Sequence, residues 1–275
     1  WTRLCTTPEQ EDLLEERLGA VEPGTFIYNG KMSGMFSSRL PLNNSPCSVS
    51  KENLPPSWLV TFPEGLQIVK MTFDLLSADN ATADKRLVQR RECEYRIFRL
   101  IEDAHVIPKI QQGFTSVDSF IELANSVTNR RKSRSGKSFE FHLEHIFNEE
   151  SITCTRGGRS EGKKSPDFLF PTVDHYHDLA WPSEKIRMLG VKTTCKDRWR
   201  QILNEADRVQ SKHLITLQEG VSVDQFREMQ AANVLLVAPA GLHEKYPKEI
   251  RGELCSLERF IAETKAICGP VNREI

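Results

Sequence analysis

The sequence predicts an α/β fold, with a mixed central sheet that has helices on both sides and follows a helical region. Between residues 151 and 237, short apolar or β-branched runs alternate with segments of helical periodicity. The run from 233 to 237, Asn-Val-Leu-Leu-Val, is almost entirely apolar, as in a strand covered on both faces. Strands that alternate with helices in this way favour a sheet with helices packed on each side.

The composition is that of an ordinary globular chain. Of 275 residues, 39% are hydrophobic and 27% are charged, and the formal net charge is -1. No apolar run reaches the roughly 18 residues of a membrane span, and no signal peptide is visible. The seven cysteines form no C-x-x-C pair, so the sequence predicts neither a disulfide framework nor a zinc ribbon. We therefore expect a protein of the reducing cytoplasm.

We expect three parts along the chain. Residues 1–40 contain a capping-box helix near 8–18 and a strand at 25–28, but too little apolar surface for a core. This part is predicted to be the tail of an upstream domain. Residues 41–57 are rich in Pro, Asn and Ser, which favours a linker, and residues 58–275 form the main domain.

Helical periodicity dominates the first part of the main domain. The predicted helices lie near residues 66–76, over 81–104, from 116 onward and over 139–148. The charges of the helix over 81–104 suit a solvated face with ion pairs or, alternatively, a helix that approaches a phosphate backbone.

A dense group of cations is predicted to form a loop between the last two helices. Five cations fall within eight residues: Arg130, Arg131, Lys132, Arg134 and Lys137. Such a group suits contact with nucleic acid, and it equally suits a mobile solvated loop.

The strands of the sheet are expected in the second half of the chain. Predicted strands lie at 151–155, 167–170, 187–192, 213–217 and 233–237. Predicted helices lie at 196–209, from 222 and from 256, the second with a Ser222–Gln225 cap.

An acid and a lysine fall at the ends of two of these strands. Asp167 begins a short apolar strand after Pro166, and Lys192 ends the apolar run 189–191. A lysine beside such a run is costly unless it faces an acid or a phosphate. Adjacent strands of this kind would bring Asp167 and Lys192 into one pocket suited to Mg²⁺, which prefers carboxylate oxygens.

The predicted helix over 196–209 adds two further features. Lys196, Asp197 and Arg198 stand at its start, where backbone N–H groups and the helix dipole favour a phosphate or a base acceptor. Arg198 could contact guanine O6 and N7, and Asp197 could accept from cytosine N4. Glu205 lies seven residues after Arg198, on the same face of an α-helix, from which it could reach the metal pocket.

The order Ser165-Pro166-Asp167, Lys192, the triplet 196–198 and Glu205 resembles the PD-(D/E)XK superfamily of restriction endonucleases. More narrowly, it resembles the EcoRII-type branch, in which the second acid has moved from the strand to the following helix. The superfamily usually has an acid two residues before the lysine, and this chain has Gly190 there. The resemblance covers about residues 58 to 268.

The resemblance implies a restriction-endonuclease-like fold and a dimeric type II enzyme of the bacterial cytoplasm. It would hydrolyse phosphodiester bonds of double-stranded DNA at a CCWGG-like site with Mg²⁺. Asp167, Lys192 and Glu205 would form the catalytic centre, with Asp167 and Glu205 as metal ligands. Lys196, Asp197 and Arg198 would read the bases, and residues 1–40 would end an effector DNA-binding domain.

Three more residues are candidates through the same resemblance. In this branch a central base pair can be flipped out of the duplex, and Arg90 and Glu94 are candidates for that region. Tyr176, just after the strand that bears Asp167, is a candidate for positioning near the active site, or else an ordinary loop tyrosine.

Two other functions remain open. One is a nuclease of the same superfamily that cuts according to DNA structure or during repair. The other is a catalytically silent DNA-binding module, which would bind DNA with a strong salt dependence but show no turnover. A digest read at the fragment ends distinguishes these alternatives.

Overall fold

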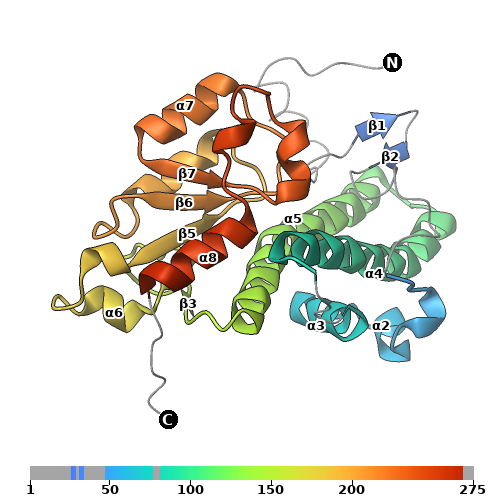
Figure 1. Cartoon of the computed structure of the whole chain (residues 1–275). Helices are drawn as coiled ribbons and strands as arrows, with labels where there is room; N and C mark the ends of the chain where they lie inside the picture. The colour runs from blue at the N-terminus through green and yellow to red at the C-terminus, as the bar shows by residue number, and fades with distance from the viewer. Residues whose placement is uncertain (1–25, 29–30, 34–46, 77–80, 269–275) are drawn as a thin grey trace, which may run out of the picture. The chain divides into compact units, whose positions relative to one another are not determined.

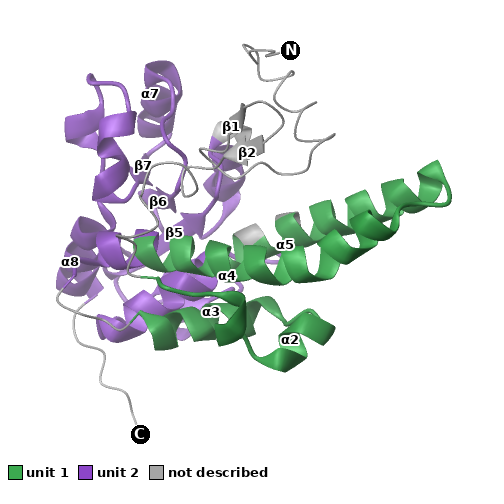
Figure 2. Cartoon of the chain, turned by 90° about the vertical axis from the view of Figure 1, so that its right-hand side faces the viewer, with its two compact units in different colours: residues 1–77, 89–138 green, residues 78–88, 139–275 purple. Residues whose placement is uncertain are grey.

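A computed structural model describes residues 26–28, 31–33, 47–76 and 81–268 of the chain. It has two compact units, residues 1–77 with 89–138 and residues 78–88 with 139–275 (Figure 2). The helix predicted at 8–18 lies outside the described residues. Among the described helices, none is long and apolar enough to cross a membrane.

The first unit is built mainly from helices. Its elements are β1 (Phe26–Tyr28), β2 (Lys31–Ser33), η1 (Lys51–Asn53), α2 (Pro56–Val60), α3 (Gly65–Leu75) and parts of α4 (Ala83–Gln112) and α5 (Val117–Glu149). Strands β1 and β2 pair antiparallel. Apolar residues of α3 and α4, such as Ile68 and Phe98, form one buried cluster with Leu54. Part of the segment 41–57 therefore packs in this unit, and the predicted domain boundaries stay a prediction.

A disulfide joins Cys47 to Cys93 inside this cluster. The expectation that the cysteines form no disulfide is therefore wrong for this pair. Sequence spacing could not reveal it, because the two residues are 46 positions apart and meet only when the segment before α2 packs on α4. The other described cysteines are free, and none of them is exposed.

The predicted basic loop at 130–137 is instead part of one continuous helix, α5. The physical reason is that two of its arginines form ion pairs with acids of α4. Arg131 Nε donates to Glu102 Oε1 over 2.8 Å, and Arg134 Nη1 donates to Glu94 Oε1 over 2.7 Å. Both acids are buried. The prediction of a mobile solvated loop is therefore wrong for Arg131 and Arg134, which form ion pairs within a helix.

The second unit contains the predicted mixed sheet, which the structure confirms (Figure 1). Its strands are β3 (Thr155–Arg156), β4 (Phe168–Phe170), β5 (Arg187–Val191), β6 (Lys212–Ile215) and β7 (Val234–Val237), in that spatial order. Pairing is antiparallel from β3 to β5 and parallel from β5 to β7. The remaining elements are α6 (Val173–His177), η2 (Ser183–Lys185), η3 (Lys196–Asn204), α7 (Val223–Ala231), η4 (Ala240–Lys245), η5 (Arg251–Glu253) and α8 (Leu257–Cys268).

Helical segments cover both faces of this sheet. On one face, Phe168 and Phe170 of β4 pack edge-on against Phe147 of α5, and Phe170 also meets Phe260 of α8. On the other face, Ile202 of η3 lies against Gly190 of β5. Side chains alternate between the faces along each strand. Gly190 therefore lies on the face opposite to Phe168, whose pairing partner is Leu189.

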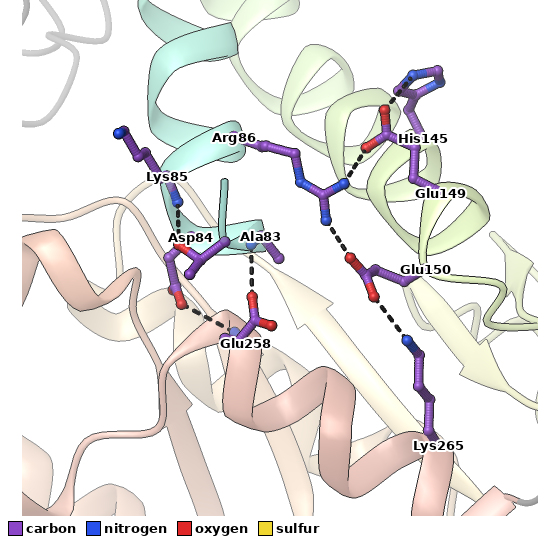
Figure 3. Close-up of polar contacts among 10 residues, drawn as sticks. Ala83, Asp84, Lys85, Arg86, His145, Glu149, Glu150, Glu258 and Lys265 are labelled. Carbon is purple, nitrogen blue, oxygen red and sulfur yellow. Dashed lines mark hydrogen bonds and ion pairs between the residues drawn. The ribbon is translucent and has the colours of Figure 1, made fainter. Parts of the chain in front are cut away.

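The starts of α4 and α8 cap each other (Figure 3). Glu258 of α8 accepts the Ala83 N–H over 2.7 Å. In return, Asp84 accepts the N–H groups of Leu257 and Glu258 over 2.8 and 3.1 Å, and that of Ala240 over 3.0 Å. Carboxylates at helix starts satisfy unpaired N–H groups and suit the helix dipole.

We expect Asp84→Ala to destabilise the protein by about 2 to 4 kcal/mol, because three backbone N–H groups would lose a buried charged acceptor. Urea unfolding measures the loss in the free energy of unfolding. Asp84→Asn keeps an acceptor oxygen and should cost less. Equal, near-zero costs for the two variants would contradict this role of Asp84.

Candidate active site

Asp167 lies immediately before β4, at the edge where β5 ends. Antiparallel pairing of Phe168 with Leu189 places Asp167 beside the last residues of β5. The Val191 N–H donates to Asp167 Oδ2 over 2.6 Å, which fixes the carboxylate. The backbone carbonyl of Asp167 accepts the Gly157 N–H over 2.9 Å. Both strand pairings therefore hold this residue in place.

Lys192 follows β5 and reaches the same carboxylate. Its backbone N–H donates to the Ile215 carbonyl over 3.1 Å, which continues the parallel pairing with β6. Its Nζ lies 3.2 Å from Asp167 Oδ2, with side-chain exposures of 19% for Lys192 and 20% for Asp167. The structure thus brings together the acid and the lysine that the sequence predicted would share a pocket.

Glu205 follows η3, which is a 3-10 helix that ends at Asn204 and not the α-helix predicted over 196–209. The helix ends because Glu205, its C-cap residue, has extended backbone angles (φ -98°, ψ 145°), and Ala206 then has a positive φ of 52°. The carbonyls of Glu205, Ala206 and Val209 accept hydrogen bonds from the Lys212 ammonium, and the Ala206 carbonyl also accepts the Val209 N–H over 2.9 Å. Contrary to the prediction, Glu205 and Arg198 therefore do not share a face of one α-helix.

The Glu205 carboxyl group is half-buried, and its Oε2 atom is buried without a hydrogen-bond partner. Burial raises the pKa of Glu205 to about 7, against the opposing charge of Lys192, and the charge of Asp167 raises it further. The charges of both Lys192 and Asp167 therefore act on the Glu205 carboxyl group. A buried carboxylate oxygen without a partner is costly unless a cation binds it.

These residues fit a divalent cation. Mg²⁺ is usually held by one or two protein carboxylates and keeps several waters. Asp167 and Glu205 supply two carboxylates, and the free oxygen of Glu205 supplies a ligand that nothing else in the described structure uses. The described residues contain no group of three or more His, Cys, Asp or Glu side chains placed for a metal.

Glu140 of α5 is an acid near the pocket that the sequence did not single out. Burial raises its pKa, and so does the charge of Asp167, while Arg156 and Lys192 lower it. Its carboxylate lies 3.5 Å from Arg156 Nη1. No motif marks Glu140 in the sequence, because it comes from a helix that precedes the sheet and meets the pocket only in the folded chain.

Gly190 has a packing reason for lacking a side chain. A Cβ atom there would lie 2.6 Å from the Cγ2 methyl of Ile202, well inside van der Waals contact. The acid that the superfamily usually carries at this position therefore has no room. The close approach of η3 that excludes it also carries Glu205 toward the pocket.

The predicted base-reading triplet starts η3. Its backbone forms the first turn after the N-cap Cys195, and the side chain of Arg198 is exposed. The side chains of Lys196 and Asp197 lie outside the described part of the chain. Base reading by these three residues stays a prediction.

Three other predicted residues are buried. Tyr176 of α6 is 2% exposed, and its hydroxyl accepts the Arg208 N–H over 3.2 Å, so it contacts the segment after Glu205. Arg90 and Glu94 of α4 are 1% and 0% exposed. Glu94 is held by Arg91 and Arg134. Contact of Arg90 and Glu94 with DNA stays a prediction, and it would require these side chains to become accessible.

A mixed sheet with a carboxylate before one strand, a lysine after the next and helices on both faces defines the restriction-endonuclease-like α/β fold. Solved structures of this class resemble the chain. Metal-depleted Ecl18kI in complex with uncleaved, modified DNA matches with a TM-score of 0.65 and 19% identity, over 86% of this chain and 89% of that one. PspGI in complex with substrate DNA matches with a TM-score of 0.62 and 15% identity, over 80% of this chain and 98% of that one.

The chain belongs to the EcoRII C-terminal family, whose model matches residues 98–261. It is 48% identical over 261 residues to the type II restriction enzyme EcoRII of Escherichia coli, across 94% of this chain. The chain spans 64% of that relative's length. It is also 28% identical over 126 residues to the type II restriction enzyme SsoII of Shigella sonnei, across 42% of this chain and 40% of that enzyme.

Proposed function

We propose that this chain is the endonuclease part of a type II restriction enzyme that hydrolyses double-stranded DNA with Mg²⁺ at a CCWGG-like site. The observation that carries the proposal is the contact of Lys192 with Asp167, with the partnerless Glu205 carboxylate in the same pocket. Family membership supports it, because the relatives EcoRII and SsoII are type II restriction enzymes.

Each residue of the pocket has a distinct role in this proposal. Asp167 and Glu205 would hold Mg²⁺, which when bound offsets charge on the phosphoryl oxygens and lowers the pKa of bound water. Lys192, fixed by Asp167, would donate to a phosphate oxygen or to the attacking water. The Val191 N–H keeps the Asp167 carboxylate oriented whether or not Lys192 turns toward DNA.

The proposal extends to partners. The structural neighbours Ecl18kI and PspGI were solved with DNA, which supports DNA as the ligand here. The exposed Arg198 at the start of η3 suits a bidentate contact with guanine. We also propose a homodimer, because two copies would match a site with near two-fold symmetry, and a location in the bacterial cytoplasm.

The test of the proposal is a digest of mixed-sequence duplex DNA with Mg²⁺, followed by sequencing of the fragment ends. We expect cuts at discrete sites that share one short sequence. Cuts that follow DNA structure would instead support the structure-specific or repair nuclease. Binding without any Mg²⁺-dependent cutting would overturn the proposal in favour of a silent DNA-binding module.

The raised pKa of Glu205, about 7, predicts a pH-dependent metal requirement. The carboxyl group must lose its proton to bind a cation, so metal binding strengthens as pH rises toward that value. At low Mg²⁺, we expect the cleavage rate to rise about tenfold per unit below roughly pH 6 and to level off above roughly pH 7. Without metal, the stability of the fold changes with pH in the opposite direction. Because the pKa of Glu205 is raised in the folded state, Glu205 favours folding at low pH, and this contribution is lost as pH rises through about 7.

The measurement is single-turnover cleavage at several Mg²⁺ concentrations across this pH range. High Mg²⁺ should move the profile to lower pH, because metal competes with the proton. An unchanged profile at low and high Mg²⁺ would contradict a metal role for Glu205.

A further inference from the structure

The turn after η3 is held by a lysine that the pocket itself does not contain. Lys212 of β6 is buried, and its Nζ donates to the backbone carbonyls of Glu205, Ala206 and Val209 over 2.5, 3.0 and 3.1 Å. An ammonium has three donors and no acceptor, so these three carbonyls satisfy it completely. One side chain of the central sheet thus fixes the backbone that carries Glu205.

The N–H groups of the same turn are also held from outside. Ser160 accepts the Ala206 N–H over 3.2 Å, and Glu161 accepts the Asp207 N–H over 3.1 Å. These contacts tie the turn to the loop before β4. The backbone position of Glu205 is therefore set by its surroundings and not by helix continuity, since η3 has already ended.

The other end of η3 is held from the residues that follow the same strand. Gln218 Oε1 accepts the N–H of the N-cap residue Cys195 over 2.6 Å. Its amide donates to the Gly220 carbonyl over 2.7 Å, and its backbone carbonyl accepts the Tyr246 hydroxyl over 2.8 Å. The side chain of Gln218 is therefore fixed at both its oxygen and its nitrogen. Thr216 Oγ1 donates nearby to the Thr193 carbonyl over 3.3 Å.

We infer that β6 and the residues after it position the two ends of η3 for two separate tasks. Lys212 is a positioning residue for the metal ligand Glu205. Gln218 is a positioning residue for the base-reading turn that begins at Lys196. The inference rests on the proposed function, and it adds that metal binding and base discrimination are set by different side chains of one sheet segment.

The chemistry of the two contacts explains the separation. Lys212 binds carbonyl oxygens, so its loss would free the Glu205 turn without touching the start of η3. Gln218 binds the N–H of the N-cap residue, so its loss would free the first turn without touching Glu205. Residues that orient a metal ligand or a reading turn without touching metal or DNA characteristically change affinity or discrimination when they are replaced.

The experiment compares Lys212→Met and Gln218→Met with two matched controls, Lys265→Met and Gln230→Met. Lys265 is an exposed lysine paired with Glu150, and Gln230 is an exposed glutamine bonded to Glu253. Three quantities are measured for the full chain. They are Mn²⁺ binding by electron paramagnetic resonance, affinity for duplex DNA without metal, and site preference. Site preference is the ratio of the cleavage rate at the sequence found in the digest to the rate at the same duplex with one G·C pair changed. The duplex for Mn²⁺ binding carries phosphorothioate linkages that block cutting.

We expect Lys212→Met to weaken Mn²⁺ binding about 10- to 100-fold, as loss of a residue that orients a metal ligand does. Its duplex affinity without metal should stay within about twofold, because phosphate contacts dominate that affinity. Gln218→Met should leave Mn²⁺ binding unchanged and reduce site preference about tenfold. Both controls should match the wild type.

Equal loss of Mn²⁺ binding and site preference in both variants would show a merely structural role and overturn the inference, as would unchanged behaviour. If Lys212→Met fails to fold, Ser160→Ala removes one bond to the same turn and should still weaken Mn²⁺ binding alone. Gln218→Glu keeps an oxygen that accepts the Cys195 N–H but loses the donor to the Gly220 carbonyl, so it should restore site preference only in part. Wild-type protein that cuts no DNA would overturn the proposed function. If the wild type cuts DNA but Lys212→Met binds Mn²⁺ normally and Gln218→Met keeps its site preference, only this inference is overturned.

Discussion

Lys192→Met should reduce cleavage about 10²- to 10³-fold while leaving DNA binding in place, because it removes one positioned charge from the reacting centre. Methionine keeps the length of the side chain. Asp167 keeps its bond from the Val191 N–H, so the carboxylate should stay oriented. The measurement is single-turnover cleavage of the digested site at saturating protein, together with the duplex Kd in EDTA.

Lys265→Met serves as the control, because it removes another lysine that forms an ion pair with a glutamate, on α8. It should cut at the wild-type rate. Asp167→Asn should lose cleavage as Lys192→Met does, since it removes the negative charge of a proposed metal ligand that also pairs with Lys192. Cleavage that persists in Lys192→Met would remove the lysine from the mechanism.

The sheet could be predicted from the sequence because buried strands consist of short runs of apolar residues. The strands β4 to β7 fall where short apolar runs stand, within one or two residues. The contact of Asp167 with Lys192 was also predictable, since residues at neighbouring strand ends must lie close together. Local patterns therefore sufficed for the strand part of the site.

Contacts between segments far apart in the sequence were not predictable. The cations of residues 130–137 suggested a loop because their partners, Glu94 and Glu102, lie about 30 to 40 positions earlier on α4. Glu140 lies on a helix without a motif, and only the folded chain shows that the charge of Asp167 reaches it. The disulfide between Cys47 and Cys93 likewise depends on tertiary packing.

The end of η3 illustrates the same limit within the site. Helical periodicity continues past Glu205 in the sequence, so a helix to residue 209 was a reasonable prediction. In the structure the helix ends because Glu205 is extended and Ala206 adopts a positive φ, and Lys212 binds the carbonyls of both residues. A residue seven positions downstream on a strand thus decides where the second acid stands.

Moving that acid back to the strand should fail. Glu205→Ala alone should reduce cleavage about 10²- to 10³-fold, because it removes a proposed metal ligand. Glu205→Ala combined with Gly190→Glu restores the number of carboxylates and the spacing usual in the superfamily. We still expect no recovery, because a Cβ at residue 190 would lie 2.6 Å from Ile202 Cγ2.

The reason lies in the closeness of η3 to the sheet. Ile202 is fully buried, and its branched Cβ leaves its methyl groups little freedom to move aside. Gly190→Ala should therefore already destabilise the protein by about 1 to 3 kcal/mol through overpacking, measured by urea unfolding. Recovery of cleavage in Glu205→Ala with Gly190→Glu would show that η3 can move away from β5. Without that movement, the packing that excludes an acid at residue 190 leaves Glu205 to supply the second carboxylate of the proposed metal site.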